Sequence, residues 1–138
     1  MPVVLSAGAR RTETPNGVMT TLASPTQGEA GAAVWRVDAI PGMVGPVHAF
    51  DTESVWTWLS GTATVELGGE LFTVGPGDTM VLPADVARQM TADPREGFAA
   101  IVVASPGAEA YNPDGVSAPD ACDLAPKGTE RTVPPWVR

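Results

Sequence analysis

The sequence predicts an all-β domain, built as an antiparallel sandwich or barrel, from three observations. Short runs of β-favouring residues recur along the chain, with glycine and proline between them. No window of about a dozen residues shows the 3.6-residue apolar period of an amphipathic helix. The chain has 138 residues, of which 43% are hydrophobic, and this suffices for one core in one domain.

The predicted strands follow one another from residue 18 to residue 104. Gly68-Gly69 lies between two of them, and both positions accept a positive φ, so we expect a tight hairpin there. Gly75-Pro76-Gly77-Asp78 predicts a second turn. The eight predicted strands are 18–24, 32–40, 54–59, 62–67, 70–74, 79–82, 88–92 and 98–104.

The two ends of the chain differ from the middle. Residues 1–31 are expected to hold the N-terminal strands after a turn-rich start, and 32–104 the barrel core. Residues 105–138 carry six prolines and form either a flexible tail or an arm on the barrel or on a partner subunit. Tyr111 and Trp136 favour the arm, because large aromatics are rare in disordered tails. We expect 133–136 to dock in extended form.

Composition excludes several classes of protein. The net charge is −8 and Lys127 is the single lysine, which argues against a nucleic-acid binder. No apolar run approaches the ~20 residues that cross a bilayer, and no signal peptide is evident, so we expect a cytoplasmic protein without a membrane partner. One cysteine, Cys122, excludes a disulfide within the chain, and one histidine, His48, excludes a site that needs two imidazoles from one chain.

The stretch from Gly42 to Gly61 resembles the first motif of the cupin superfamily. That motif reads Gly, five residues, His-x-His, three or four residues, Glu, six residues and Gly, and here its frame passes through His48. The stretch that starts at Gly77 resembles the second motif. The resemblance covers residues 32–104. It implies a small single-domain cupin, an antiparallel double-stranded β-helix or jelly-roll barrel, here with a Pro-rich C-terminal arm.

The family's metal-ligand set is degenerate in this chain. Cupins usually hold a metal with two His and a Glu of the first motif and a His of the second, and these positions are His48, Phe50, Ser54 and Arg88 here. A benzyl ring cannot bind a metal, and a guanidinium is permanently cationic. We therefore expect no family-type metal site and no cofactor.

A shifted metal site is the alternative. Asp51, Glu53 and Gln89 each lie one residue from an expected ligand position, and such a slip turns a strand side chain out of the barrel. A bulge between His48 and Ser54 would bring Glu53 inward, where it could bind a divalent metal together with His48. Without a bulge, Asp51 and Glu53 belong to a solvated loop.

Strand alternation predicts which side chains line the barrel cavity. If position 54 faces inward, as the family's Glu does, then Trp56 and Trp58 also face inward. We expect an aromatic pocket whose polar groups are one imidazole and one guanidinium. For the two tryptophans, plain core filling is the alternative. The predicted substrate-binding residues are Phe50, Ser54, Trp56, Trp58 and Met90.

His48 and Arg88 are the candidate catalytic residues. Without a metal, His48 is expected to act as general base or acid near neutral pH, while Arg88 binds a carboxylate, phosphate or enolate oxygen. Such a pair suffices for proton abstraction next to a carbonyl. The alternatives are a hydrogen-bonded core histidine and a surface arginine. Cys122 has no further histidine to activate it, so a Cys–His nucleophile is not expected.

Three functional hypotheses follow. The first is an isomerase, cyclase or decarboxylase of specialised metabolism that acts on an aromatic or polyketide-like anion, as several similar cupins do. The second is a non-catalytic cupin that binds a small molecule, and the third is a metal-dependent cupin with non-standard ligands. The resemblance also implies a homodimer formed by terminal segments, which would cover the outward-facing Val55 and Leu59.

Overall fold

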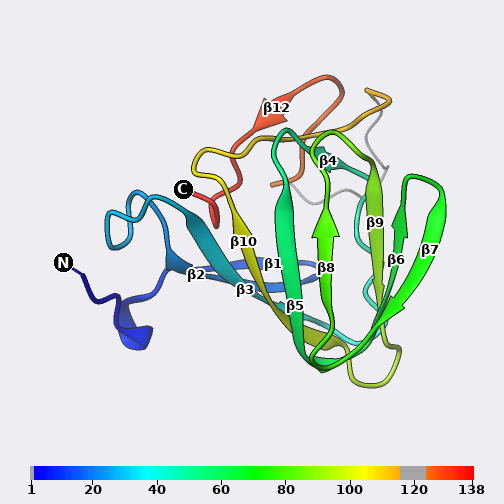
Figure 1. The fold of residues 1–138 in the computed structure, drawn as a ribbon, viewed down its shortest axis with the longest axis horizontal. Coiled ribbons are helices and arrows are strands. Elements are labelled where there is room, and N and C mark those ends of the chain that lie inside the picture. Colours follow the sequence, from blue (N-terminus) through cyan, green and yellow to red (C-terminus); the bar gives the residue numbers. More distant parts are fainter. Residues whose placement is uncertain (1, 116–123) are drawn as a thin grey trace.

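The computed structural model describes residues 2–115 and 124–138, which form an all-β barrel of antiparallel strands (Figure 1). This confirms the predicted fold class. A short 3₁₀ turn, η1 (Ser6–Gly8), precedes the strands. The strands are β1 (Arg11–Thr14), β2 (Gly17–Ala23), β3 (Ala33–Ala39), β4 (Ala49–Phe50), β5 (Ser54–Gly61), β6 (Ala63–Leu67), β7 (Glu70–Val74), β8 (Thr79–Leu82), β9 (Arg88–Ala92), β10 (Phe98–Ala104), β11 (Ala110–Tyr111) and β12 (Arg131–Thr132).

Three sheets build the barrel. The largest has six strands in the order β1-β2-β3-β10-β5-β8, and a second has the order β7-β6-β9. A small third sheet, β12-β11-β4, lies at the end of the barrel that is uppermost in Figure 1. Each of the eight predicted strands is present. The four strands that the sequence did not predict, β1, β4, β11 and β12, have two to four residues, too few for a clear alternating pattern.

Both predicted turns are confirmed. Gly68 and Gly69 connect β6 to β7 with φ values of 57° and 87°, and Leu67 pairs directly with Glu70. In the second turn, the Asp78 N–H donates to the Gly75 carbonyl at 3.0 Å. These turns fix the register of β6, β7 and β8, and thereby which of their side chains face the core.

The core consists of the inward-facing residues of the central strands. Burial alternates along β3, β5 and β9, so that Trp35 and Trp58 are almost completely enclosed, at 2% and 0% exposed. On the outer side of β5, Val55 is half-buried and Leu59, near the end of the strand, is exposed. The predicted homodimer, which would cover this face, stays a prediction.

The described part of the C-terminal segment packs against the barrel. Val137 is fully buried, and the Thr21 hydroxyl donates to the Trp136 carbonyl at 3.0 Å. Residues 135–137 form a turn in which the Val137 N–H donates to the Pro134 carbonyl at 2.9 Å. The extended conformation expected for 133–136 is therefore wrong, because this bond folds the segment back. Cys122 lies outside the described residues.

Over residues 2–115 and 124–138, the structure contains no helix with the length and apolarity needed to cross a membrane.

Gly61, the last glycine of the first motif, provides a test of the barrel's close packing. It has a φ of 69°, and a Cβ there would lie 2.0 Å from the Gly97 carbonyl oxygen. Gly77 has a similar φ of 85° but open space around it, so it serves as the matched control. Gly61→Ala should lower the free energy of unfolding by about 3 kcal/mol or more, and Gly77→Ala by about 1 kcal/mol. Urea unfolding measures both, and equal losses would contradict the close contact.

Candidate functional site

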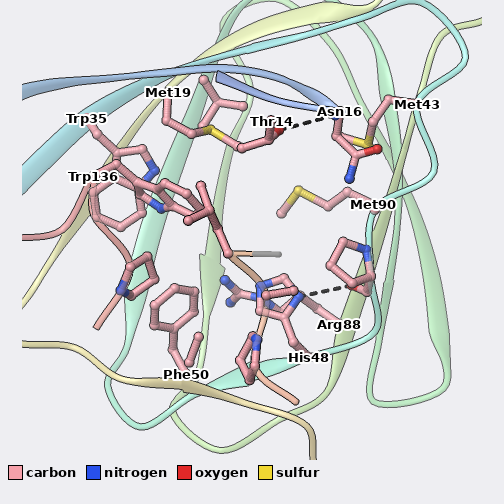
Figure 2. A pocket seen from close by; sticks show the side chains of 18 of the residues that line it. Thr14, Asn16, Met19, Trp35, Met43, His48, Phe50, Arg88, Met90 and Trp136 are labelled. Carbon is pink, nitrogen blue, oxygen red and sulfur yellow. Dashed lines mark hydrogen bonds between the residues drawn. The ribbon is translucent and has the colours of Figure 1, made fainter. Parts of the chain in front are cut away.

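A cavity of about 120 Å³ lies inside the barrel, and its wall is mostly apolar (Figure 2). The N-terminal strands, the strands that carry the two cupin-like motifs, strand β10 and the C-terminal segment all contribute to it. Its lining residues are Thr14, Asn16, Met19, Trp35, Val37, Met43, Gly45, Pro46, His48, Phe50, Trp56, Arg88, Met90, Phe98, Ala110, Leu124, Ala125, Pro126, Pro134 and Trp136.

Backbone pairing places His48 directly opposite Arg88. The His48 N–H donates to the Arg88 carbonyl at 3.1 Å, and the Arg88 N–H donates to the His48 carbonyl at 2.9 Å. Residues that exchange both hydrogen bonds across an antiparallel pair carry their side chains on the same face. Here that face is the cavity wall, where Arg88 Nε donates to His48 Nε2 at 3.3 Å.

The hydrogen bonds of His48 define its tautomer. Nδ1 lies 2.9 Å from the Pro46 carbonyl oxygen, which can only accept, so Nδ1 carries the proton. Nε2 then holds the lone pair that accepts from Arg88. Burial, followed by the charge of Arg88, lowers the pKa of His48 to about 3, against a smaller opposing effect of the Pro46 bond. The imidazole is therefore neutral at pH 7. This differs from the titration near neutral pH expected of an unmetallated histidine.

Arg88 is a buried cation without an ion-pair partner in the described chain. It is 3% exposed, and its guanidinium lies 4.6 Å from the centre of the Phe50 ring, a cation–π contact. Burial lowers its pKa to about 10, so it remains charged at neutral pH. The ion pair between Arg36 and Asp38 lies elsewhere in the described chain, and no carboxylate of the described residues pairs with Arg88. A buried, uncompensated charge is costly, and such residues concentrate at functional sites.

The other predicted substrate-binding residues separate into two layers. Phe50, Trp56 and Met90 line the cavity, whereas Ser54 and Trp58 do not. Ser54 lies behind Trp56 and accepts a hydrogen bond from its indole N–H at 3.3 Å. Trp58 is fully buried and stacks on Trp56 with a centroid distance of 5.7 Å. Ser54 and Trp58 therefore support Trp56 from the core. For Trp58, this agrees with the alternative that the tryptophan fills the core.

The shifted metal site is not assembled in the structure. Asp51 accepts the Glu109 backbone N–H at 2.8 Å, Glu53 is exposed, and Gln89 donates to the Gly45 carbonyl at 3.0 Å. The described residues contain no group of three or more His, Cys, Asp or Glu side chains that could hold a metal ion.

The residues at the family's ligand positions also do not fit a metal. Their side chains are an imidazole, a benzyl ring, a hydroxyl and a guanidinium, and the free imidazole lone pair faces that guanidinium. No step of the proposed chemistry is therefore routed through a metal.

Several lining residues come from segments that the motifs do not cover. Trp35 could have been found, because it shares the inward face of β3 with Val37, two residues further along the strand. Trp136 is an aromatic in the C-terminal segment that the sequence singles out, but nothing in the sequence places it at the cavity. Met19 and Asn16 carry no signal, because they reach the cavity through the packing of the β1–β2 hairpin against the barrel.

Solved structures with the cupin fold resemble this chain. An RmlC-like cupin from Shewanella frigidimarina NCIMB 400 has a TM-score of 0.67 and 18% identity, over 78% of this chain and 92% of that one. The polyketide cyclase RemF from Streptomyces resistomycificus has a TM-score of 0.65 and 19% identity, over 78% and 83%. The Streptomyces nucleoside dehydratase Pac13 has a TM-score of 0.60 and 15% identity, over 75% of this chain and 80% of that one.

No protein-family model and no curated protein sequence matches the chain. The similarity to these solved structures shows that the chain is a small cupin-fold domain. This agrees with the resemblance of its two motifs. The φ of 62° at Asp85 agrees with this register, because Asp85 occupies the position of the second motif's glycine.

The lowered pKa of His48 predicts how the stability of the protein depends on pH. Unfolding restores the ordinary pKa near 6.5, so between pH 7 and pH 5 the unfolded chain gains a proton that the folded chain does not. The free energy of unfolding should therefore fall by about 1–2 kcal/mol as the pH falls from 7 to 5. His48→Gln removes the single histidine, so the free energy of unfolding of this variant should change less than that of the wild type between pH 7 and pH 5. Urea unfolding at both pH values measures the difference, and equal slopes would contradict the depressed pKa.

Because Arg88 is a buried charge without a counter-ion among the described residues, shortening its side chain should not destabilise the protein. Arg88→Met keeps the apolar stem and removes the buried charge, so the free energy of unfolding should stay equal or rise by up to about 2 kcal/mol. Arg36→Met, on the outer face, is the control for the loss of one positive charge. A loss above about 2 kcal/mol for Arg88→Met alone would assign the guanidinium a structural role instead.

Proposed function

We propose that this cupin-fold domain is a small-molecule enzyme that transfers a proton on an anionic substrate with an apolar body. Arg88 binds the anionic oxygen, and His48 accepts and returns the proton. The observation that carries the proposal is the buried guanidinium without a counter-ion, hydrogen-bonded to a neutral imidazole in a mostly apolar cavity. This combination supplies a site for negative charge beside an atom that can hold a proton.

Substrate binding would activate the base. The charge of Arg88 helps to lower the pKa of His48, so an anion bound to Arg88 offsets that charge and raises the pKa. The Nε–Nε2 distance of 3.3 Å is also long for a hydrogen bond. A small movement of the guanidinium toward the anion would therefore free the Nε2 lone pair.

The proton transfer then balances without a further reactant. His48 Nε2 takes a proton from a carbon next to a carbonyl, and the electron pair of that C–H bond moves to the carbonyl oxygen. The resulting enolate is stabilised by the Arg88 guanidinium. The imidazolium returns the proton to the same or another carbon, as in an isomerisation, an epimerisation or one step of a cyclisation.

Two comparisons support catalysis in general. RemF is a polyketide cyclase and Pac13 a nucleoside dehydratase, so proteins of this fold act on small organic molecules. At 15–19% identity they do not identify the substrate here. A polyketide-like or aromatic anion of specialised metabolism agrees with the aromatic wall formed by Phe50, Trp56 and Trp136.

Binding without catalysis is the second candidate function. It is favoured by the pKa of about 3 at His48 and by the commitment of both ring nitrogens to hydrogen bonds. In this case the cavity would hold an anion through Arg88, and His48 would only orient the guanidinium.

Hydrogen–deuterium exchange on two enolisable probes separates these functions. Phenylpyruvate and phenylacetylphosphonate each join an anionic group to a ketone with an adjacent CH₂, and ¹H NMR in D₂O follows the loss of the CH₂ signal. The protein should accelerate exchange over buffer for at least one probe, and His48→Gln should reduce the acceleration by about 100-fold while binding persists.

Arg36→Gln is the matched control, because it removes a positive charge from the outer face and should leave the exchange unchanged. Binding of a probe without any acceleration would support the second candidate and contradict proton transfer. Equal acceleration by the wild type and by His48→Gln would remove His48 from the mechanism.

A further inference from the structure

The orientation of Arg88 restricts which anions it can bind. A guanidinium offers two donor edges, one that includes Nε and one formed by Nη1 and Nη2. Nε is engaged by His48, and Phe50 lies against the guanidinium face. The Nη1–Nη2 edge has no hydrogen-bond partner in the described chain. Its two parallel donors match the two oxygens of a planar carboxylate.

The charge of the cavity favours a monoanion. Arg88 is the single arginine in the described lining, which contains no lysine and no carboxylate. One negative charge would therefore be neutralised. A dianion such as a phosphate monoester would keep an unpaired charge in a largely apolar site, which is costly.

The size of the cavity limits the apolar part of the ligand. Its volume of about 120 Å³ is close to that of an engineered cavity of about 150 Å³ that binds benzene. In Figure 2, Trp35 and Trp136 lie on one side of the cavity, and Met43 and Met90 on the other. A cavity of this size holds an apolar ligand body of about one benzene ring.

Trp136 is a fixed part of this wall. Thr21, which is fully buried, donates its hydroxyl proton to the Trp136 carbonyl at 3.0 Å, and the neighbouring Val137 is fully buried. These contacts hold the backbone of the C-terminal turn, so the indole limits the length of any ligand that starts at Arg88.

We propose that the ligand is a monocarboxylate with an apolar body of about one ring, bound end-on by Nη1 and Nη2 of Arg88 and limited in size by Trp136. This inference rests on the proposed function, in which the cavity is the substrate site, and names the class of that substrate.

Calorimetric titration with three matched compounds tests the head group. 3-Phenylpropionate, 3-phenylpropanamide and 2-phenylethylphosphonate share a phenylethyl body and differ in charge and shape at the end. The carboxylate should bind at least about tenfold more tightly than the other two. Arg88→Lys keeps the charge but lacks the two-donor edge and should lose the preference for the carboxylate over the phosphonate. Arg36→Lys should keep it.

A size series tests the role of Trp136. The wild type should bind 3-phenylpropionate more tightly than 3-(2-naphthyl)propionate, and Trp136→Ala should reverse this order. Trp136→Leu is the second variant, because it keeps more of the packing and should shift the order in the same direction. An unchanged order in a folded variant would remove Trp136 as the size limit.

The outcomes separate this inference from the proposed function. If the phosphonate binds as tightly as the carboxylate, the carboxylate class is overturned and the proton-transfer function stands. If the amide binds as tightly as the carboxylate, Arg88 does not recognise an anion, and both are overturned. If none of the three binds at millimolar concentration, both are likewise overturned.

Discussion

The site depends on one backbone pairing, the antiparallel bridge between His48 and Arg88. It brings an imidazole and a guanidinium within hydrogen-bonding distance inside the barrel, and each affects the state of the other. The cation helps to keep the imidazole neutral, and the imidazole occupies Nε, so that the other edge of the guanidinium is left to the cavity. Without this pairing there would be a histidine and an arginine in the fold, but no shared site.

A charge in such a place reduces stability, and the rest of the barrel offsets that cost. The stacked Trp56 and Trp58 and the closed sheets around them supply apolar burial, and the cation–π contact with Phe50 stabilises the guanidinium partly. A chain shaped for stability alone would place an aliphatic residue at position 88. The cost of an arginine at this position is one reason for the proposal that Arg88 binds an anion.

Local patterns in the sequence predicted most of the fold. Strands with alternating burial and glycine-marked turns carry their own signal, and the two motif frames placed His48 and Arg88 near each other. Strand alternation predicts whether a side chain points inward, but not whether it reaches the cavity or packs behind another side chain. For this reason Ser54 and Trp58 were expected at the cavity, although they lie behind Trp56.

Other features of the site could not be predicted because they arise from tertiary packing. Trp136 and Asn16 reach the cavity from the two ends of the chain, and no local pattern reports that contact. The state of His48 depends on burial and on a cation forty residues away in sequence. A motif frame identifies the position of such a residue, but its environment sets its chemistry.

The protonation state of His48, the single histidine of the chain, is the most direct test of the proposed site. ¹⁵N NMR of the imidazole across pH 4–8, in the free protein and with saturating 3-phenylpropionate, reports the tautomer and the pKa. In the free protein the ring should be neutral, with the proton on Nδ1, down to about pH 4, and bound carboxylate should raise its pKa. A free-state pKa near 6.5, unchanged by the carboxylate, would contradict the proposed site.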